Sequence, residues 1–160
     1  MSPHLFLTRA VEPGLSLLPG YMTSDCAKIW LMTIAGQETN LQARAQKVAK
    51  GPPPALGFWQ FEQAGVDAVL RSQAKLAQGI LETWDIPVSE AHAALQYNDP
   101  VACAFARLLL WSDPAPLPLA SDTAAGWNAY LKTWRPGKPD AARWPSAHSV
   151  AMTAVCAQIS

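Results

Sequence analysis

The chain has 160 residues, half of which are hydrophobic, and its 12 Lys and Arg residues balance its 12 Asp and Glu residues. This length suits one domain that buries a core without disulfides or metals, and the apolar content excludes a disordered chain. The balanced charge, without a basic cluster, argues against nucleic-acid binding, because a phosphate backbone is neutralised by grouped Lys and Arg.

Clusters of the 14 prolines divide the chain into segments of helical length, and the apolar residues between them recur with a period near 3.6. Alternating β patterns of useful length are missing from the sequence; Leu117-Pro118-Leu119-Ala120 comes nearest, and its proline is better suited to an extended connector. We therefore expect an all-α or strongly α-dominated single domain over residues 1–160, with Pro-rich loops.

The first well-marked helix is expected to begin at Thr23-Ser24-Asp25, which has good N-cap chemistry. One stripe of this helix consists of Ala27, Trp30, Leu31, Ile34 and Glu38. A carboxyl group that emerges from an apolar helix face tends to keep its proton near neutral pH, because burial disfavours the charged form. Glu38 is therefore a candidate proton donor to a leaving oxygen, the chemistry of a glycosidase. The alternative is an ordinary helix-end residue in solvent, although the helix dipole disfavours a carboxylate there.

Two later helices also carry clear signals. Asn98 and Pro100 mark a helix start, and Ser112-Asp113-Pro114 marks its end. A further apolar stripe from Trp127 to Trp134 is expected to end at Pro136-Gly137. Weaker helices are expected near residues 5–12, 62–84, 88–96 and 146–158.

Seven tryptophans are many for a chain of this size. Aromatic faces suit sugar rings, but the helix-periodic positions of four of them predict core residues; these are Trp30, Trp84, Trp111 and Trp127. Trp59 and Trp134 lie next to turns and are the better candidates for sugar subsites. Cys26, Cys103 and Cys156 are far apart in apolar stretches, which favours free core thiols over disulfides.

Two motifs resemble a known family. Gln37-Glu38-Thr39 and the stretch Gly57–Phe61 resemble the Glu-Ser and Gly-Leu-Met-Gln signatures of lysozyme-like soluble lytic transglycosylases. Over residues 20–145 the chain is similar to small lysozyme-like proteins of tailed bacteriophages and prophages, which share the stretches found here at Gly57–Glu62 and Trp134–Pro139. The resemblance implies a lysozyme-like fold with Glu38 as the catalytic acid and then base, and with Gly57–Gln60 as the floor of the cleft.

The chain departs from the family in three places. Thr39 replaces a serine, and the stretch between the two motifs is longer and contains Pro52-Pro53-Pro54. By its distance from Gly137, Trp134 takes the place of the family's tyrosine, so that a hydroxyl near the acid is expected to be missing. The candidate substrate-binding residues are Gly57, Phe58, Trp59, Gln60, Glu62, Trp134 and Arg135, and Lys138 is a further loop cation.

The implied activity is cleavage of the β-1,4 bond between N-acetylmuramic acid and N-acetylglucosamine in peptidoglycan. A second carboxylate about 5 Å from the acid acts as nucleophile, and one at about 6.5–9.5 Å activates water. Glu62 is the one candidate for this role. Without it, the substrate's acetamido group and 6-hydroxyl would complete the reaction and give a 1,6-anhydro product, which is the lytic transglycosylase route.

Two other function classes stay open. One is a structural virion or tail protein with little or no activity, which would dock on other virion proteins through Leu15–Pro19 and Pro114–Leu119. The other is a carbohydrate-binding module that uses Trp59 and Trp134. The expected partners are peptidoglycan strands and, in the structural hypothesis, virion neighbours.

No cofactor and no metal are expected, because His4, His92 and His148 are scattered and lack matching ligands. The N-terminal stretch does not have the pattern of a signal peptide, and a run of about 18 apolar residues is missing. We therefore expect no membrane insertion, and a location in the virion or in the host cytoplasm before assembly or lysis.

Overall fold

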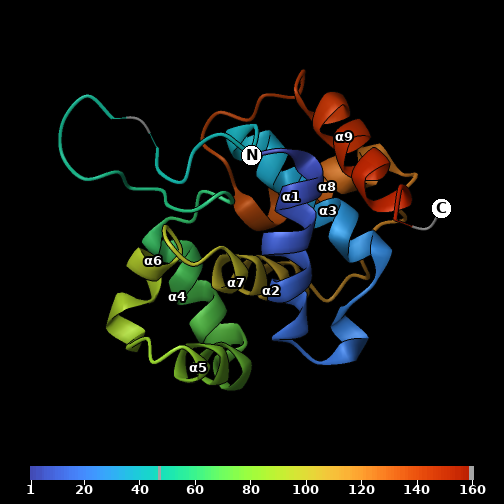
Figure 1. Cartoon of the computed structure of the whole chain (residues 1–160). Helices are drawn as coiled ribbons and strands as arrows, with labels where there is room; N and C mark the ends of the chain where they lie inside the picture. The colour runs from blue at the N-terminus through green and yellow to red at the C-terminus, as the bar shows by residue number, and fades with distance from the viewer. Residues whose placement is uncertain (47, 159–160) are drawn as a thin grey trace.

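The computed structural model describes residues 1–46 and 48–158, and within them the chain is helical without β-strands (Figure 1). The expected all-α fold class is confirmed. The elements are α1 (Pro3–Phe6), η1 (Leu7–Val11), α2 (Glu12–Ser16), η2 (Gly20–Met22), α3 (Asp25–Thr39), α4 (Gln63–Ser72), α5 (Ala74–Thr83), η3 (Val88–Glu90), α6 (Ala91–Ala94), α7 (Asp99–Trp111), α8 (Thr123–Trp134) and α9 (Trp144–Cys156).

The N-terminal elements α1, η1 and α2 follow one another without a break and form one rod across the molecule (Figure 1). The π-helical turn η1 and α2 bury Leu7, Val11 and Leu15 in the core. Gly14 lies where the rod crosses α7, and a Cβ at this position would overlap the side chain of Cys103. The glycine therefore permits the rod and α7 to approach closely.

Helix α3 is the central helix of the fold and packs most extensively on α9. Ser24 caps it as expected, since its Oγ accepts a hydrogen bond from the Ala27 amide at 3.0 Å. Residues 27–37 are buried apart from Lys28, so that the helix is enclosed on nearly all sides and not only along one stripe. Its last residues, which include Glu38, therefore emerge from a buried and mostly apolar helix, in which Thr33 and Gln37 are the buried polar residues.

Helix α7 has the expected boundaries, and α8 begins at Thr123, before the stripe from Trp127 that predicted it. Asn98 caps α7, because its side-chain oxygen accepts from the Val101 amide at 3.1 Å, and Asp122 caps α8 in the same way. Helix α8 ends at Trp134 as expected, but Arg135, with φ 49°, adopts the left-handed cap conformation in place of Gly137. The sequence therefore predicted where the helix ends but not that Arg135 is its C-cap residue.

The region expected to be helical over 62–84 contains α4 and α5, which Gln73 separates. The prediction that Trp84 and Trp111 are core residues is wrong, because they are 45% and 41% exposed.

The three cysteines are free, as expected. Cys103 is buried, but Cys156 is exposed and is not a core residue. Among the described residues, no helix combines the length and apolar character that a membrane span requires.

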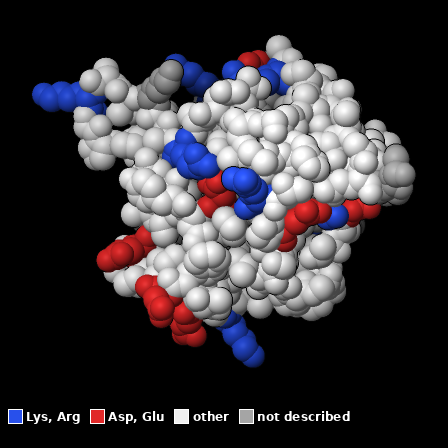
Figure 2. Space-filling view, viewed as in Figure 1, with Lys and Arg blue, Asp and Glu red and all other residues white. Residues whose placement is uncertain are grey.

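Figure 2 shows that Lys, Arg, Asp and Glu are interspersed on one face of the molecule, with wide uncharged areas between them. A loop between α3 and α4 extends away from the helices (Figure 1). It contains the longer, proline-containing stretch noted in the sequence, and it leads into the aromatic turn at residues 56–61.

Candidate functional site

The aromatic turn is a tight hairpin. Leu56 and Phe61 pair through two backbone hydrogen bonds of 2.9 and 2.8 Å, so that Gly57–Gln60 forms a four-residue loop. Gly57 has φ 74°, and a Cβ at this position would lie 2.5 Å from the carbonyl oxygen of Leu95. The position therefore requires glycine both for its backbone conformation and for the close approach to Leu95.

The hairpin is attached to the middle and the end of α3 by side-chain hydrogen bonds. Thr39 donates through Oγ1 to the carbonyl of Phe58 at 3.3 Å and to that of Ala35 at 3.0 Å. The indole Nε1 of Trp59 donates to the carbonyl of Leu31 at 2.9 Å. These bonds bring the two sequence motifs, which are far apart in the chain, into direct contact.

Glu38 is half-buried at the end of α3 and accepts a hydrogen bond from a buried tyrosine. The hydroxyl of Tyr130, which is 2% exposed on α8, donates to Oε1 of Glu38 at 2.7 Å. Burial raises the pKa of Glu38 above its ordinary value, and the hydrogen bond from Tyr130 and the positive charge of Arg143 partly oppose this effect. The site therefore contains a carboxyl group that resists ionisation and has a fixed orientation.

Tyr130 is a residue that the sequence interpretation missed as part of the site. Burial, and the neighbouring acid Glu38, also raise the pKa of this phenol, so that it stays a hydrogen-bond donor over the whole range of ordinary pH. The expectation that Trp134 takes the tyrosine's place and leaves the acid without a hydroxyl is wrong. Tyr130, one helical turn before Trp134 on α8, supplies the hydroxyl. The spacing of four between Tyr130 and Trp134 places both on one face of α8, and this signal was available in the sequence.

Trp134 lies beside the acid site and joins the hairpin to α8. Its indole Nε1 donates to the carbonyl of Trp59 at 2.9 Å, and its ring centroid lies 6.4 Å from that of Tyr130. The ring is also 5.9 Å from that of Phe61. Trp134 is partly exposed and remains a candidate for sugar contact at this site.

The rings of the hairpin do not fit the expected sugar subsite. Trp59 is 0% exposed and Phe58 is also fully in the core, where both pack against Phe6. The prediction that the face of Trp59 is available to a sugar is therefore wrong for this conformation. Trp59 and Phe58 instead offer their backbone carbonyls to Trp134 and Thr39.

The remaining expected site residues differ in their surroundings. Gln60 closes the hairpin, since its Nε2 donates to the carbonyl of Gly57 at 2.8 Å. Glu62 is exposed just before α4, and Arg135 is exposed at the end of α8, where its Nε donates to the carbonyl of Lys132. In the part of the chain that the structure describes, neither Glu62 nor Arg135 makes a hydrogen bond or ion pair with Glu38.

The segment before α9 is fixed beside Glu38 by Gln37. The side-chain nitrogen of Gln37 donates to the carbonyl of Asp140 at 2.8 Å, and Arg143 donates to the backbone carbonyl of Gln37 at 2.9 Å. These bonds explain why the charge of Arg143 acts on Glu38. Among residues 1–46 and 48–158, no group of three or more His, Cys, Asp and Glu side chains could hold a metal ion.

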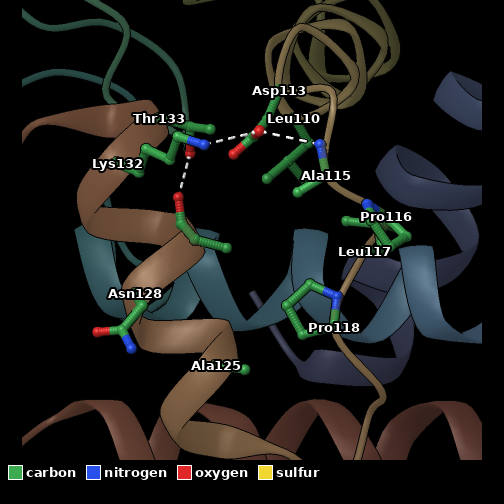
Figure 3. A pocket seen from close by; sticks show the side chains of 11 residues that line it. Leu110, Asp113, Ala115, Pro116, Leu117, Pro118, Ala125, Asn128, Lys132 and Thr133 are labelled. Carbon is green, nitrogen blue, oxygen red and sulfur yellow. Dashed lines mark hydrogen bonds and ion pairs between the residues drawn. The ribbon is translucent and has the colours of Figure 1, made fainter.

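Two hollows lie elsewhere, on the connector between α7 and α8. Their volumes are about 220 and 260 Å³, and the residues that line them do not include Glu38 or the hairpin. The connector residues Ala115–Leu117 line both hollows, of which the first is drawn in Figure 3.

Comparison with known proteins gave no relative. No protein-family model matches the chain, and no curated protein and no solved structure matches it. The function is therefore argued from the residues of the chain itself.

Proposed function

We propose that this chain is a peptidoglycan-cleaving glycosidase of phage origin, with Glu38 as the general acid and then the base. The observation that supports it most is the hydrogen-bonded pair of Glu38 and Tyr130 at the end of a buried helix. A carboxyl whose pKa is raised by burial is a recurring mark of catalytic acids. The resemblance of the two sequence motifs to lysozyme-like proteins favours the same activity.

In the proposed reaction, protonated Glu38 donates its proton to the glycosidic oxygen while the C1–O bond breaks and an oxocarbenium-like centre develops. The negative charge that then forms on Glu38 is stabilised by the hydrogen bond from Tyr130 and by the nearby charge of Arg143. The same two groups therefore stabilise the carboxylate that forms, while burial still holds the pKa of Glu38 above its ordinary value.

The second half of the reaction follows from the surroundings of Glu38. Since Glu62 is exposed and not in contact with Glu38, we assign the remaining steps to the substrate. Its acetamido oxygen would stabilise the cationic C1, and its 6-hydroxyl would then attack C1 while Glu38 takes up the hydroxyl proton. This sequence gives a 1,6-anhydro product, and one protein carboxyl is sufficient for it.

The test is mass spectrometry of the soluble fragments that the chain releases from purified peptidoglycan. We expect anhydro-muropeptides from the wild type, and a loss of about 100-fold or more with Glu38→Gln, since proton transfer contributes this much. Glu62→Gln is the matched control and should keep the activity. Products with reducing ends would instead indicate a muramidase, and loss of activity in the Glu62 variant would make that residue its second carboxylate.

A structural virion protein is the second candidate. Leu119 in the connector is 75% exposed, and hollows lie beside this connector, as a docking segment would require. The prediction that Leu15–Pro19 also docks on a partner is wrong, because Leu15 and Leu18 are buried. Release of no fragment by the wild type, together with multimers in solution, would favour this candidate. The burial of Trp59 argues against a carbohydrate-binding module, because that hypothesis requires the Trp59 ring to contact sugar.

A further inference from the structure

The two hollows beside the connector differ in how their charges are paired. In the first hollow, Lys132 donates to the carboxylate of Asp113 at 2.8 Å, and the same oxygen accepts from the Ala115 amide at 3.1 Å (Figure 3). The charges in this hollow therefore satisfy each other, and the remaining lining is mostly apolar.

The second hollow contains a buried cation, Arg107 of α7. Arg107 is 4% exposed, and its Nε donates to the carbonyl of Met22 at 2.8 Å. Its Nη1 is buried and has no hydrogen-bond partner among the described residues. The guanidinium carbon lies 4.9 Å from the centre of the Trp111 ring, which holds the group in place.

Within residues 1–46 and 48–158, no carboxylate makes an ion pair with this guanidinium. Asp113 also lines the hollow, but its carboxylate pairs with Lys132. The titratable groups that act on Arg107 are the thiols of Cys26 and Cys103, and burial raises the pKa of both, so that they are neutral.

An arginine cannot escape this situation by losing its proton, because guanidinium stays charged at all ordinary pH. A buried cation without an anion carries a desolvation cost that an ion partner is needed to offset. An anion from outside the chain that entered the hollow lined by Arg107 would supply the missing negative charge.

We propose that the second hollow binds a carboxylate on a small apolar group, with Arg107 as the anchor. The apolar walls come from Leu110, Trp111, Pro114, Pro116 and Leu117. A single guanidinium matches one negative charge, which favours a carboxylate over a doubly charged phosphate. The volume of about 260 Å³ lies just below the usual range for small-molecule sites, and so fits a small acid or one residue at a chain end.

Two sources could supply this carboxylate: a free small acid and the C-terminal residue of a peptide. We would titrate the full chain with N-acetyl-leucine, with a hexapeptide that ends in leucine, and with the C-terminal amides of both. The readout is the NMR shift of the Arg107 Nε–H and of the Trp111 indole N–H. Tighter binding of the hexapeptide would support a chain end, and equal binding would support a free acid.

We expect the two acids to shift both signals in a saturable way at millimolar concentration, and the amides to bind about 10-fold more weakly or not at all, because the charge-assisted contact is lost. Inorganic phosphate should bind more weakly than either acid. Equal binding of acid and amide, tighter binding of phosphate, or no shift with any probe would overturn the proposal.

Variants locate the site independently of these probes. Arg107→Met should abolish acid binding, whereas Arg9→Met, at an exposed arginine of η1 that lines neither hollow, should leave it unchanged. Ala115 is exposed and lines the hollow, so that Ala115→Trp should obstruct it without disturbing the core. Acid binding that persists in folded Arg107→Met, or in Ala115→Trp as read from the Arg107 signal, would contradict the assignment.

Discussion

Two ionisable side chains, the half-buried Glu38 and the buried Arg107, differ in how the cost of their burial is compensated. On the face formed by α3, α8 and the hairpin, Glu38 has a hydrogen-bond donor in Tyr130 and keeps its own proton more readily than usual. On the face formed by α7 and the connector, Arg107 has one hydrogen bond, to Met22, and no anionic partner among the described residues.

The difference follows from the chemistry of the two groups. A carboxyl can reduce the cost of burial by staying neutral, so that Glu38 needs nothing from outside the chain. A guanidinium cannot, and its charge has to be matched by another group. The cost of burying a charge therefore favours a proton donor on one face and, in our proposal, an anion-binding site on the other.

The largest expected effect is the loss of stability on removal of a tryptophan ring, which should be greater for Trp59 on the first face than for Trp111 on the second. Trp59→Ala should lower the free energy of unfolding by about 3–5 kcal/mol, because the ring is fully buried and its loss leaves a cavity. Trp111→Ala should cost about 1 kcal/mol, because 41% of this residue is already exposed. Denaturant unfolding measures the change in free energy for each variant. Equal losses would contradict the difference in burial between Trp59 and Trp111.

The next effect is on Arg107. Arg107→Met should raise the free energy of unfolding by about 1–2 kcal/mol, since an apolar side chain of similar length replaces an unpaired buried cation. The orphaned carbonyl of Met22 reduces this gain. Lys132→Met, which removes an exposed cation, should change stability by about 0.5 kcal/mol or less. A clear loss of stability in Arg107→Met would mean that the cation already has its compensation inside the fold.

Glu38→Gln should stabilise the protein in a pH-dependent manner. The pKa of Glu38 in the folded state lies above its ordinary value of 4.5, so that between these two values the folded state binds more protons than the unfolded state. The stability of the wild type therefore falls as the pH rises through this window. The gain from Glu38→Gln should be present near pH 7 and should disappear at pH values below 4.5. A gain that is independent of pH would contradict this origin.

The smallest effect is expected for Tyr130→Phe. Loss of one hydrogen bond should cost about 1 kcal/mol, and it should raise the pKa of Glu38 further, because the bond from Tyr130 favours the carboxylate. Carbon NMR of the Glu38 carboxyl measures this shift. The basic limb of peptidoglycan cleavage should move to higher pH with it. Tyr21→Phe, at an exposed tyrosine, is the control and should change neither quantity.

The sequence predicted those parts of the site that depend on local signals. Glu38 follows from the stripe of α3, and the hairpin follows from Gly57 and its neighbours. The partner Tyr130 was missed because it lies 92 positions from Glu38, and the contact depends on how α8 packs against α3. The burial of Trp59 was missed for the same reason, since a turn residue can face either solvent or a helix behind it.

The sequence by itself determined the fold class and several ends of the main helices, because N-caps such as Ser24 and Asn98 act within one turn of the chain. Only the tertiary structure decided which charges are paired, which rings are covered and which residue faces Glu38. These properties depend on contacts between segments far apart in the chain, and the local pattern around a residue does not specify its distant neighbours.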